Sequence, residues 1–255
     1  MGGYSRRVAW ASMAALLSLT SCQAGSSRTA RSVDSGPPRY EVSCPTQGDC
    51  NASVALLVGL SAPSEPTRCT AALIGARTAV TAGHCVTRQL STGGACDGIW
   101  LGFAQTDGRP SEWIGCERIL SVSTPGATLL SPDYAILELA KDTTRPSIPL
   151  GDRDVAFGEV VQMVSVTADR FYDDVHQVRS RRCVVDDNGQ FSPWSATASR
   201  SIRVLSSCPI RQGSSGAPVL DREGRLRGLV HAGGPPYFAF GLMTLLPQPI
   251  ESDDG

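Results

Sequence analysis

The chain has 255 residues, of which 41% are hydrophobic and 18% charged, so it can bury a sizeable core and is not an intrinsically disordered polymer. Its formal net charge of -1 provides no basic surface for a nucleic acid, and we expect no nucleic-acid partner. The 26 glycines and 17 prolines favour many short strands joined by turns, which predicts an all-β fold.

Residues 1–21 have the layout of an export signal. Arg6 and Arg7 precede an apolar run from Val8 to Leu19, and small residues follow before Cys22. A membrane-spanning helix needs about 20 apolar residues, and this run of about 12 is too short to be one. We therefore expect export and removal of the segment.

The end of this signal, Leu19-Thr20-Ser21-Cys22, resembles the lipobox of bacterial lipoproteins. The resemblance implies cleavage before Cys22 and acylation of that cysteine, so that a lipid anchor holds the protein to a membrane of the bacterial envelope, in the periplasm or at the cell surface. The alternative is an ordinary secretory signal followed by an incidental cysteine. Residues 22–43 are rich in Ser, Arg, Thr, Gly and Pro, and we expect a flexible tether there.

The chain contains nine cysteines, and assigning Cys22 to lipid leaves an even number for disulfides in an oxidising compartment. A zinc site is the competing interpretation, but the sequence has no Cys-x-x-Cys pair and only three histidines. We therefore expect four disulfides, no metal and no cofactor. Pairing of sequence neighbours suggests Cys44–Cys50, Cys96–Cys116 and Cys183–Cys208 among the many pairings possible.

Short apolar runs bounded by turn residues predict strands from residue 54 onward. They are Val54 to Leu60, Thr70 to Ile74, Thr78 to Thr81, Ile99 to Phe103, Tyr134 to Leu139, Val160 to Val166, Val219 to Leu220 and Leu226 to Val230. The stretch from Lys141 to Asp154 carries prolines, a glycine and several charges, which is typical of a connection. We expect two β domains, residues 44–145 and 146–250, and a tail at 251–255.

The segment Thr81-Ala82-Gly83-His84-Cys85 is the first of three that carry chemistry together. Small residues before His84 permit a tight turn at the end of a strand, and a disulfide at Cys85 would fix the imidazole. A single histidine is more often structural than catalytic, so this segment decides nothing alone.

The second and third segments supply a carboxylate and a hydroxyl. Asp133 leads directly into the apolar strand Tyr134 to Leu139, although an aspartate before a strand is usually a turn former. In Gly213-Ser214-Ser215-Gly216 the glycines let the backbone curve tightly, so that the amides of Gly213 and Ser215 can converge on one point as an oxyanion hole. A Gly/Ser cluster by itself is more often a plain turn.

Taken together, the three segments resemble the trypsin/chymotrypsin family of serine peptidases, in its bacterial secreted form. The likeness rests on the spacing of Cys69 and Cys85 around the His84 turn, on Asp-x-Ala-Ile-Leu-x-Leu from Asp133, and on the glycine-rich loop around Ser215. The order His, Asp, Ser separates this family from the α/β hydrolases and the subtilisins. The resemblance implies two six-stranded antiparallel barrels with the active site between them, and a Cys69–Cys85 disulfide.

The same resemblance implies a serine endopeptidase that cleaves protein or peptide substrates through an acyl-enzyme, without a cofactor. His84 would be the general base for the Ser215 hydroxyl, Asp133 would orient the imidazole, and the N–H groups of Gly213 and Ser215 would bind the oxyanion. The alternative is a catalytically inert protease fold that serves as a binding or scaffolding lipoprotein. We expect a monomer.

Some positions depart from the family pattern. Ser214 stands where the zymogen-activated branch has an aspartate that receives a newly cut amino terminus, so we expect no activation of that kind. Pro209 lies where trypsin relatives recognise Arg or Lys, which disfavours cleavage after basic residues. Ala232 replaces a pocket-wall tryptophan and predicts a more open wall. His231 is either a structural strand residue or part of an acidic-specificity site similar to that of glutamyl endopeptidases. The expected substrate-binding residues are Pro209, Ile210, Gln212, His231, Ala232 and Gly233.

Overall fold

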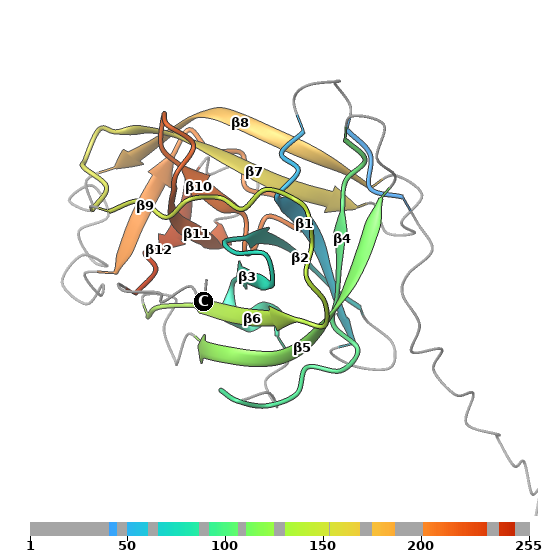
Figure 1. The fold of residues 1–255 in the computed structure, drawn as a ribbon. Helices are drawn as coiled ribbons and strands as arrows, with labels where there is room; N and C mark the ends of the chain where they lie inside the picture. Colours follow the sequence, from blue (N-terminus) through green and yellow to red (C-terminus); the bar gives the residue numbers. More distant parts are fainter. Residues whose placement is uncertain are drawn as a thin grey trace, which may run out of the picture. The chain divides into compact units, whose positions relative to one another are not determined.

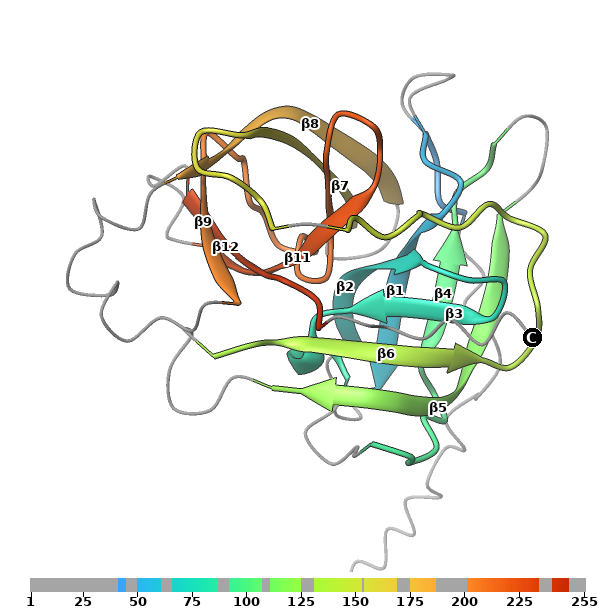
Figure 2. The same ribbon diagram turned by 60° about the vertical axis from the view of Figure 1, so that its left-hand side comes forward.

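The computed structural model describes residues 41–44, 50–60, 66–86, 92–106, 111–124, 131–152, 154–168, 175–186, 201–233 and 240–247. Within these residues the chain forms twelve strands in two closed antiparallel barrels, and one short 3₁₀ helix (Figure 1 and Figure 2). The expected all-β fold of two six-stranded barrels is confirmed. The predicted signal at 1–21, Cys22 and the tail at 251–255 lie outside the described residues. No helix in the described part of the chain is long and apolar enough to cross a membrane.

Barrel 1 comprises the first six strands, closed in the order β1-β2-β3-β6-β5-β4. Their bounds are β1 Val54–Leu60, β2 Pro66–Leu73, β3 Thr78–Thr81, β4 Trp100–Phe103, β5 Glu112–Ser123 and β6 Tyr134–Leu139. β1 has an unbroken apolar run because both of its faces are covered. Ala55 and Leu57 belong to the core of barrel 1, whereas Leu56 and Val58 belong to a second cluster shared with barrel 2.

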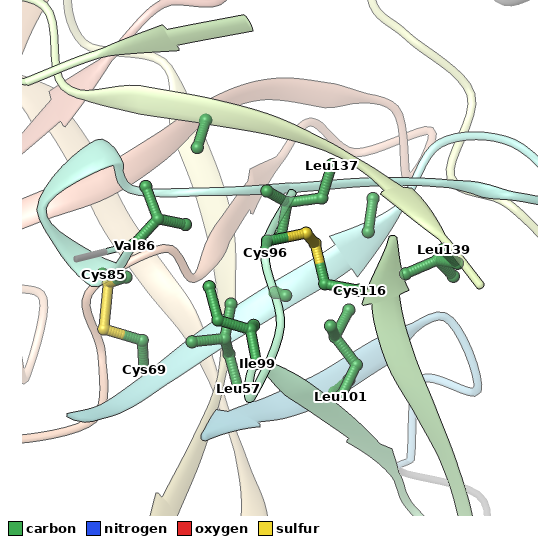
Figure 3. Close-up of a cluster of buried hydrophobic side chains, with 14 of the residues drawn as sticks. Leu57, Cys69, Cys85, Val86, Cys96, Ile99, Leu101, Cys116, Leu137 and Leu139 are labelled. Atoms are coloured by element: carbon green, nitrogen blue, oxygen red, sulfur yellow. A yellow bond between two sulfur atoms is a disulfide. The ribbon is translucent and has the colours of Figure 1, made fainter. Parts of the chain in front are cut away.

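Aliphatic side chains and two disulfides fill the interior of barrel 1 (Figure 3). Leu57, Leu101 and Leu137 are fully buried there. The disulfide Cys69–Cys85 joins β2 to the 3₁₀ helix η1, Gly83–Cys85, so it ties the residue after His84 to the core. Closing a loop of this sequence separation, 16 residues, stabilises a fold by about 3 kcal/mol.

Barrel 2 comprises the last six strands, closed in the order β10-β11-β12-β9-β8-β7. Their bounds are β7 Val160–Ala168, β8 Val175–Asp186, β9 Ile202–Ser206, β10 Pro218–Leu220, β11 Leu226–Gly233 and β12 Phe240–Thr244. Its core holds Met163, Leu205, Val219 and Met243. The strands β5, β8, β9 and β12 are not among those expected from the sequence.

The four disulfides have the pairings expected from sequence proximity and from the family resemblance: Cys44–Cys50, Cys69–Cys85, Cys96–Cys116 and Cys183–Cys208. Disulfides in this number are typical of proteins that fold in an oxidising compartment outside the cytosol. They indicate an exported protein.

Residues 41–43, the end of the expected tether, lie within the fold. Val42 is fully buried, and its carbonyl accepts a hydrogen bond from the N–H of Gln105 at 3.0 Å. The N–H of Ser43 donates to the carbonyl of Val175 on β8 at 2.7 Å. This segment, at the end of the predicted tether, therefore contacts both barrels.

Candidate active site

The histidine turn, residues 82–85, begins where β3 ends and is pressed against β5 and Asp133. The N–H of Cys85 donates to the carbonyl of Ala82 at 3.1 Å, which closes the short η1 helix. A Cβ atom at Gly83 would overlap the carbonyl oxygen of Ser123 and lie 2.9 Å from Oδ1 of Asp133. Only glycine fits at position 83, and it lets the turn approach the carboxylate closely.

His84 and Asp133 form a paired site. Oδ2 of Asp133 lies 2.6 Å from Nδ1 of His84, and Oδ1 accepts the main-chain N–H of His84 at 2.9 Å. The Asp133 side chain is fully buried, whereas 39% of the His84 side chain is exposed. Since a carboxylate only accepts hydrogen bonds, this geometry places the ring proton on Nδ1 and leaves the lone pair of the neutral imidazole on Nε2. Nε2 can then accept a proton from another group.

The main chain of Asp133 is held from barrel 2. Its N–H donates to the hydroxyl of Thr244 on β12 at 3.1 Å, and that hydroxyl lies 2.9 Å from Nδ1 of His231. Thr244 is fully buried and His231 is almost so. The two residues therefore connect the aspartate to β11 and β12 through buried polar contacts, and this arrangement favours the structural interpretation of His231 over an acidic-specificity site.

The serine loop, residues 208–217, lies against the histidine turn. Gly216 has a φ of +79°, and a Cβ atom there would overlap the carbonyl oxygen of Thr70 and the hydroxyl of Thr81 and lie 2.9 Å from the main-chain nitrogen of Ala82. The carbonyl of Ser215 accepts the N–H of Thr70 at 2.7 Å. Glycine at position 216 thus lets the serine pack next to the strand that leads to His84.

The three expected catalytic residues therefore come from loops in mutual contact, but only two of the three side chains are hydrogen-bonded to each other. His84 and Asp133 are hydrogen-bonded, but the Ser215 hydroxyl makes no hydrogen bond to any described residue. Nε2 of His84 lies 3.8 Å from the disulfide sulfur of Cys85. Catalytic hydrogen bonds are often long before substrate binds, and the contact of the serine loop with the histidine turn keeps Ser215 beside the strand that leads to His84.

The main-chain N–H groups of the serine loop include the two candidate oxyanion donors, Gly213 and Ser215. The carbonyl of Gly213 accepts the hydroxyl of Thr70 at 2.7 Å, and the carbonyl of Ser214 accepts the N–H of Ala217 at 3.0 Å. The N–H groups of Gly213 and Ser215, in contrast, donate to no acceptor within the described ranges. Unpaired donors beside a candidate nucleophile are what an oxyanion hole requires.

Ser214 is fully buried and is satisfied by its own loop. Its hydroxyl accepts the N–H of Arg211 at 3.1 Å, and its N–H donates to the carbonyl of Arg211 at 3.0 Å. A neutral, locally paired hydroxyl at this position needs no charged partner.

The expected specificity residues separate into three environments. Pro209 and Gln212 are exposed. Ala232 packs against the apolar cluster of Ile202, Val204 and Leu242. Ile210 lies against Gly233: a Cβ atom at Gly233 would be 2.5 Å from Cγ2 of Ile210, and one at Gly241, which pairs with Gly233, would be 2.7 Å from Cγ1.

Thr70, Thr81 and Thr244 were missed by the sequence reasoning. Each contributes a buried hydroxyl to contacts around the candidate triad. Thr70 stands next to a cysteine and Thr244 in an apolar strand, and neither position carries a local pattern that signals its partner more than 100 residues away, at separations of 143 and 111.

Two antiparallel barrels with a histidine–aspartate pair and a glycine-rich serine loop at their junction define a serine-peptidase fold. The chain belongs to the family of trypsin-like peptidase domains, which matches residues 69–229. That membership makes a protein or peptide the expected class of substrate.

Solved structures with the same fold include two inactivated protease paralogues. The scabies mite inactivated protease paralogue S-D1 is 14% identical, with a TM-score of 0.57 over 76% of this chain and 87% of its own. The scabies mite paralogue S-I1 is 17% identical, with a TM-score of 0.58 over 78% and 91%. The structure of GrC is 16% identical, with a TM-score of 0.58 over 76% and 89%. No curated protein matches the chain.

Proposed function

We propose that the chain is an active serine endopeptidase with His84, Asp133 and Ser215 as its catalytic triad. The observation that carries the proposal is the buried carboxylate of Asp133, which binds both Nδ1 and the main-chain N–H of His84. This arrangement leaves the lone pair of Nε2 free to accept a proton, and the serine loop packs against the same turn.

Each residue has one role in hydrolysis. Nε2 of His84 removes the proton from the Ser215 hydroxyl as Oγ attacks the scissile carbonyl, and then donates it to the leaving amine. Asp133 stays ionised and stabilises the transient imidazolium. The N–H groups of Gly213 and Ser215 bind the developing oxyanion, a contribution of about 3 kcal/mol per donor. Water then hydrolyses the acyl-enzyme, with His84 as base again.

The competing proposal is an inert protease fold that binds partners. It is favoured by the inactivated paralogues among the structural neighbours and by a Ser215 hydroxyl that makes no hydrogen bond to the part of the chain that the structure describes. Labelling with a serine-directed fluorophosphonate separates the two proposals. We expect the wild type to be labelled, and Ser215→Ala and His84→Ala not to be. A wild-type protein that stays unlabelled, although folded, would establish the inert alternative.

Ile210 suggests the size of the preferred substrate side chain. The residue before the scissile bond holds its carbonyl at Ser215, so its side chain must lie beside the segment that precedes the serine. Ile210 belongs to that segment, and its side chain lies against the paired glycines Gly233 and Gly241. We therefore infer a preference for a small side chain, such as alanine or serine, before the scissile bond.

A peptide library that varies the residue before the scissile bond tests this preference. Ile210→Ala is expected to improve cleavage after leucine relative to alanine by about 10-fold or more, since one or two methylene groups in a pocket change selectivity by that order. Ile148→Ala, which truncates a buried isoleucine in the connection between the barrels, is the matched control. Efficient cleavage after large residues by the wild type would contradict the assignment.

For the part of the chain that precedes the fold, we propose export and lipidation at Cys22. The lipobox-like sequence supports lipidation, and the four disulfides support export. In a bacterial host fed radiolabelled palmitate, the wild type should incorporate label and partition into detergent, and Cys22→Ala should do neither. Release of an unlabelled wild-type protein would establish an ordinary secretory signal.

A further inference from the structure

The side chain of Thr70, on β2 of barrel 1, is buried at the junction with barrel 2. Its hydroxyl donates to the carbonyl of Gly213 at 2.7 Å and accepts the N–H of Val166 on β7 at 2.9 Å. Because a carbonyl oxygen only accepts and an N–H only donates, the single hydroxyl hydrogen points to Gly213 and a lone pair faces Val166. Thr70 is fully buried, so no solvent competes for these bonds.

The main chain of Thr70 extends this contact to the serine and the histidine. Its N–H donates to the carbonyl of Ser215 at 2.7 Å, and its carbonyl accepts the hydroxyl of Thr81 at 2.7 Å. Thr70 also follows Cys69, whose disulfide partner Cys85 is next to His84. Thr70 thus contacts both candidate oxyanion residues and β3, the strand that precedes the general base His84.

Gly213 needs such a restraint because of its own conformation. Its φ of +93° lies in the region that glycine enters freely, so the residue itself does little to fix the peptides on either side. A Cβ atom at position 213 would lie 2.7 Å from the carbonyl oxygen of Val166, so a larger residue cannot supply the rigidity. A hydrogen bond to the Gly213 carbonyl fixes the peptide that joins Gly213 to Ser214.

We propose that the Thr70 hydroxyl is a positioning group that sets the orientation of Gly213 and thereby the aim of the oxyanion-binding N–H groups. This inference rests on the proposed peptidase function. The effect is specific to the transition state. If Gly213 turns, its N–H points away from the oxyanion, which exists only after attack, so binding of the oxyanion weakens while substrate binding stays nearly unchanged.

The test compares Thr70→Val, which keeps the shape and removes the hydroxyl, with Thr70→Ser, which keeps the hydroxyl. Removal of one oxyanion donor costs about 100-fold or more in kcat, and misalignment of a donor costs less. We therefore expect Thr70→Val to lower kcat by about 10-fold or more with little change in KM, and Thr70→Ser to recover most of the loss. The fluorophosphonate labelling rate should follow kcat.

Thr143→Val is the matched control. Thr143 is a buried threonine after β6 whose hydroxyl bonds Glu112 and the N–H of Arg145, so its loss also removes two hydrogen bonds. We expect this variant to keep the wild-type kcat. An unchanged kcat in folded Thr70→Val, or an equal loss in Thr143→Val, would overturn the inference.

A readout independent of activity separates this inference from the proposed function. The amide resonance of Gly213 in a ¹⁵N–¹H spectrum should shift in Thr70→Val, return in Thr70→Ser and stay in place in Thr143→Val. A wild type that fails to react with the fluorophosphonate would overturn the peptidase proposal, and the Gly213 resonance would still decide the role of Thr70. An unmoved resonance would refute that role whatever the activity.

Discussion

Replacing Asp133 by asparagine should abolish most of the activity by moving one proton. The carboxylate accepts two hydrogen bonds from His84, one from the main-chain N–H at 2.9 Å and one from Nδ1 at 2.6 Å. The main-chain N–H can only donate, so the amide oxygen of the introduced asparagine must remain opposite it. The amide NH₂ group then faces Nδ1, and because it donates, the ring proton moves to Nε2. The Ser215 hydroxyl is left without a base.

The size of this effect follows from the complete burial of Asp133, since no water can replace the lost acceptor. A wrong tautomer in a triad of this kind lowers kcat by about 10⁴-fold, or about 5 kcal/mol. The assay is steady-state hydrolysis of a peptide substrate, with melting temperature as a check on folding. Asp154→Asn changes a carboxylate that is 80% exposed and serves as the control. A folded Asp133→Asn enzyme within about tenfold of the wild-type kcat would refute the tautomer argument.

Three further outcomes are expected. Gly216→Ala should destabilise the fold by several kcal/mol more than Gly93→Ala in thermal unfolding, because both glycines have positive φ but only Gly216 is crowded, by Thr70 and Thr81; equal melting temperatures would contradict this. Replacing both Cys69 and Cys85 by alanine should cost about 3 kcal/mol in denaturant unfolding, and a cost near zero would show that the bond does not constrain the chain. Removal of residues 1–40 should leave kcat/KM unchanged, because Ser214 is already satisfied by Arg211; a large gain in activity would reveal activation by cleavage.

The strands that the sequence predicts best are those with two covered faces. β1 and β6 have the predicted bounds because their apolar runs are nearly continuous, with Glu138 of β6 as the one charged residue. Alternate residues of these runs lie in the barrel 1 core and in the cluster shared with barrel 2. β5 is different: Ile114, Cys116 and Ile119 are buried, but register shifts after Cys116 and Ile119 break the alternation, and charged residues lie between them. A period of two cannot be recognised across such bulges.

The candidate site also contains residues that the sequence predicts and residues that it does not. His84, Asp133 and Ser215 each lie in a short segment whose residue types are set by local geometry, such as Gly83, which must admit the carboxylate, and Gly216, which must admit the strand from Thr70. The hydroxyls that hold these segments together have no such signature. Threonine is common in strands, and a threonine hydroxyl can bond a distant segment only where the fold brings that segment next to it.

Apolar and polar contacts have different effects at the junction between the barrels, and this difference explains why the hydrogen bonds of Thr70 matter for catalysis. The cluster shared by the barrels, which includes Leu56, Val166 and Leu229, supplies cohesion that depends on buried area and tolerates small sliding. Catalysis tolerates much less, since a displacement of about 1 Å at the reacting groups costs about 100-fold in rate. Directional hydrogen bonds are the contacts that can fix the junction to that accuracy, and those of Thr70 link the serine loop to β2 and β3. Variants of the apolar cluster should therefore change stability before selectivity or kcat, and variants of Thr70 should do the reverse.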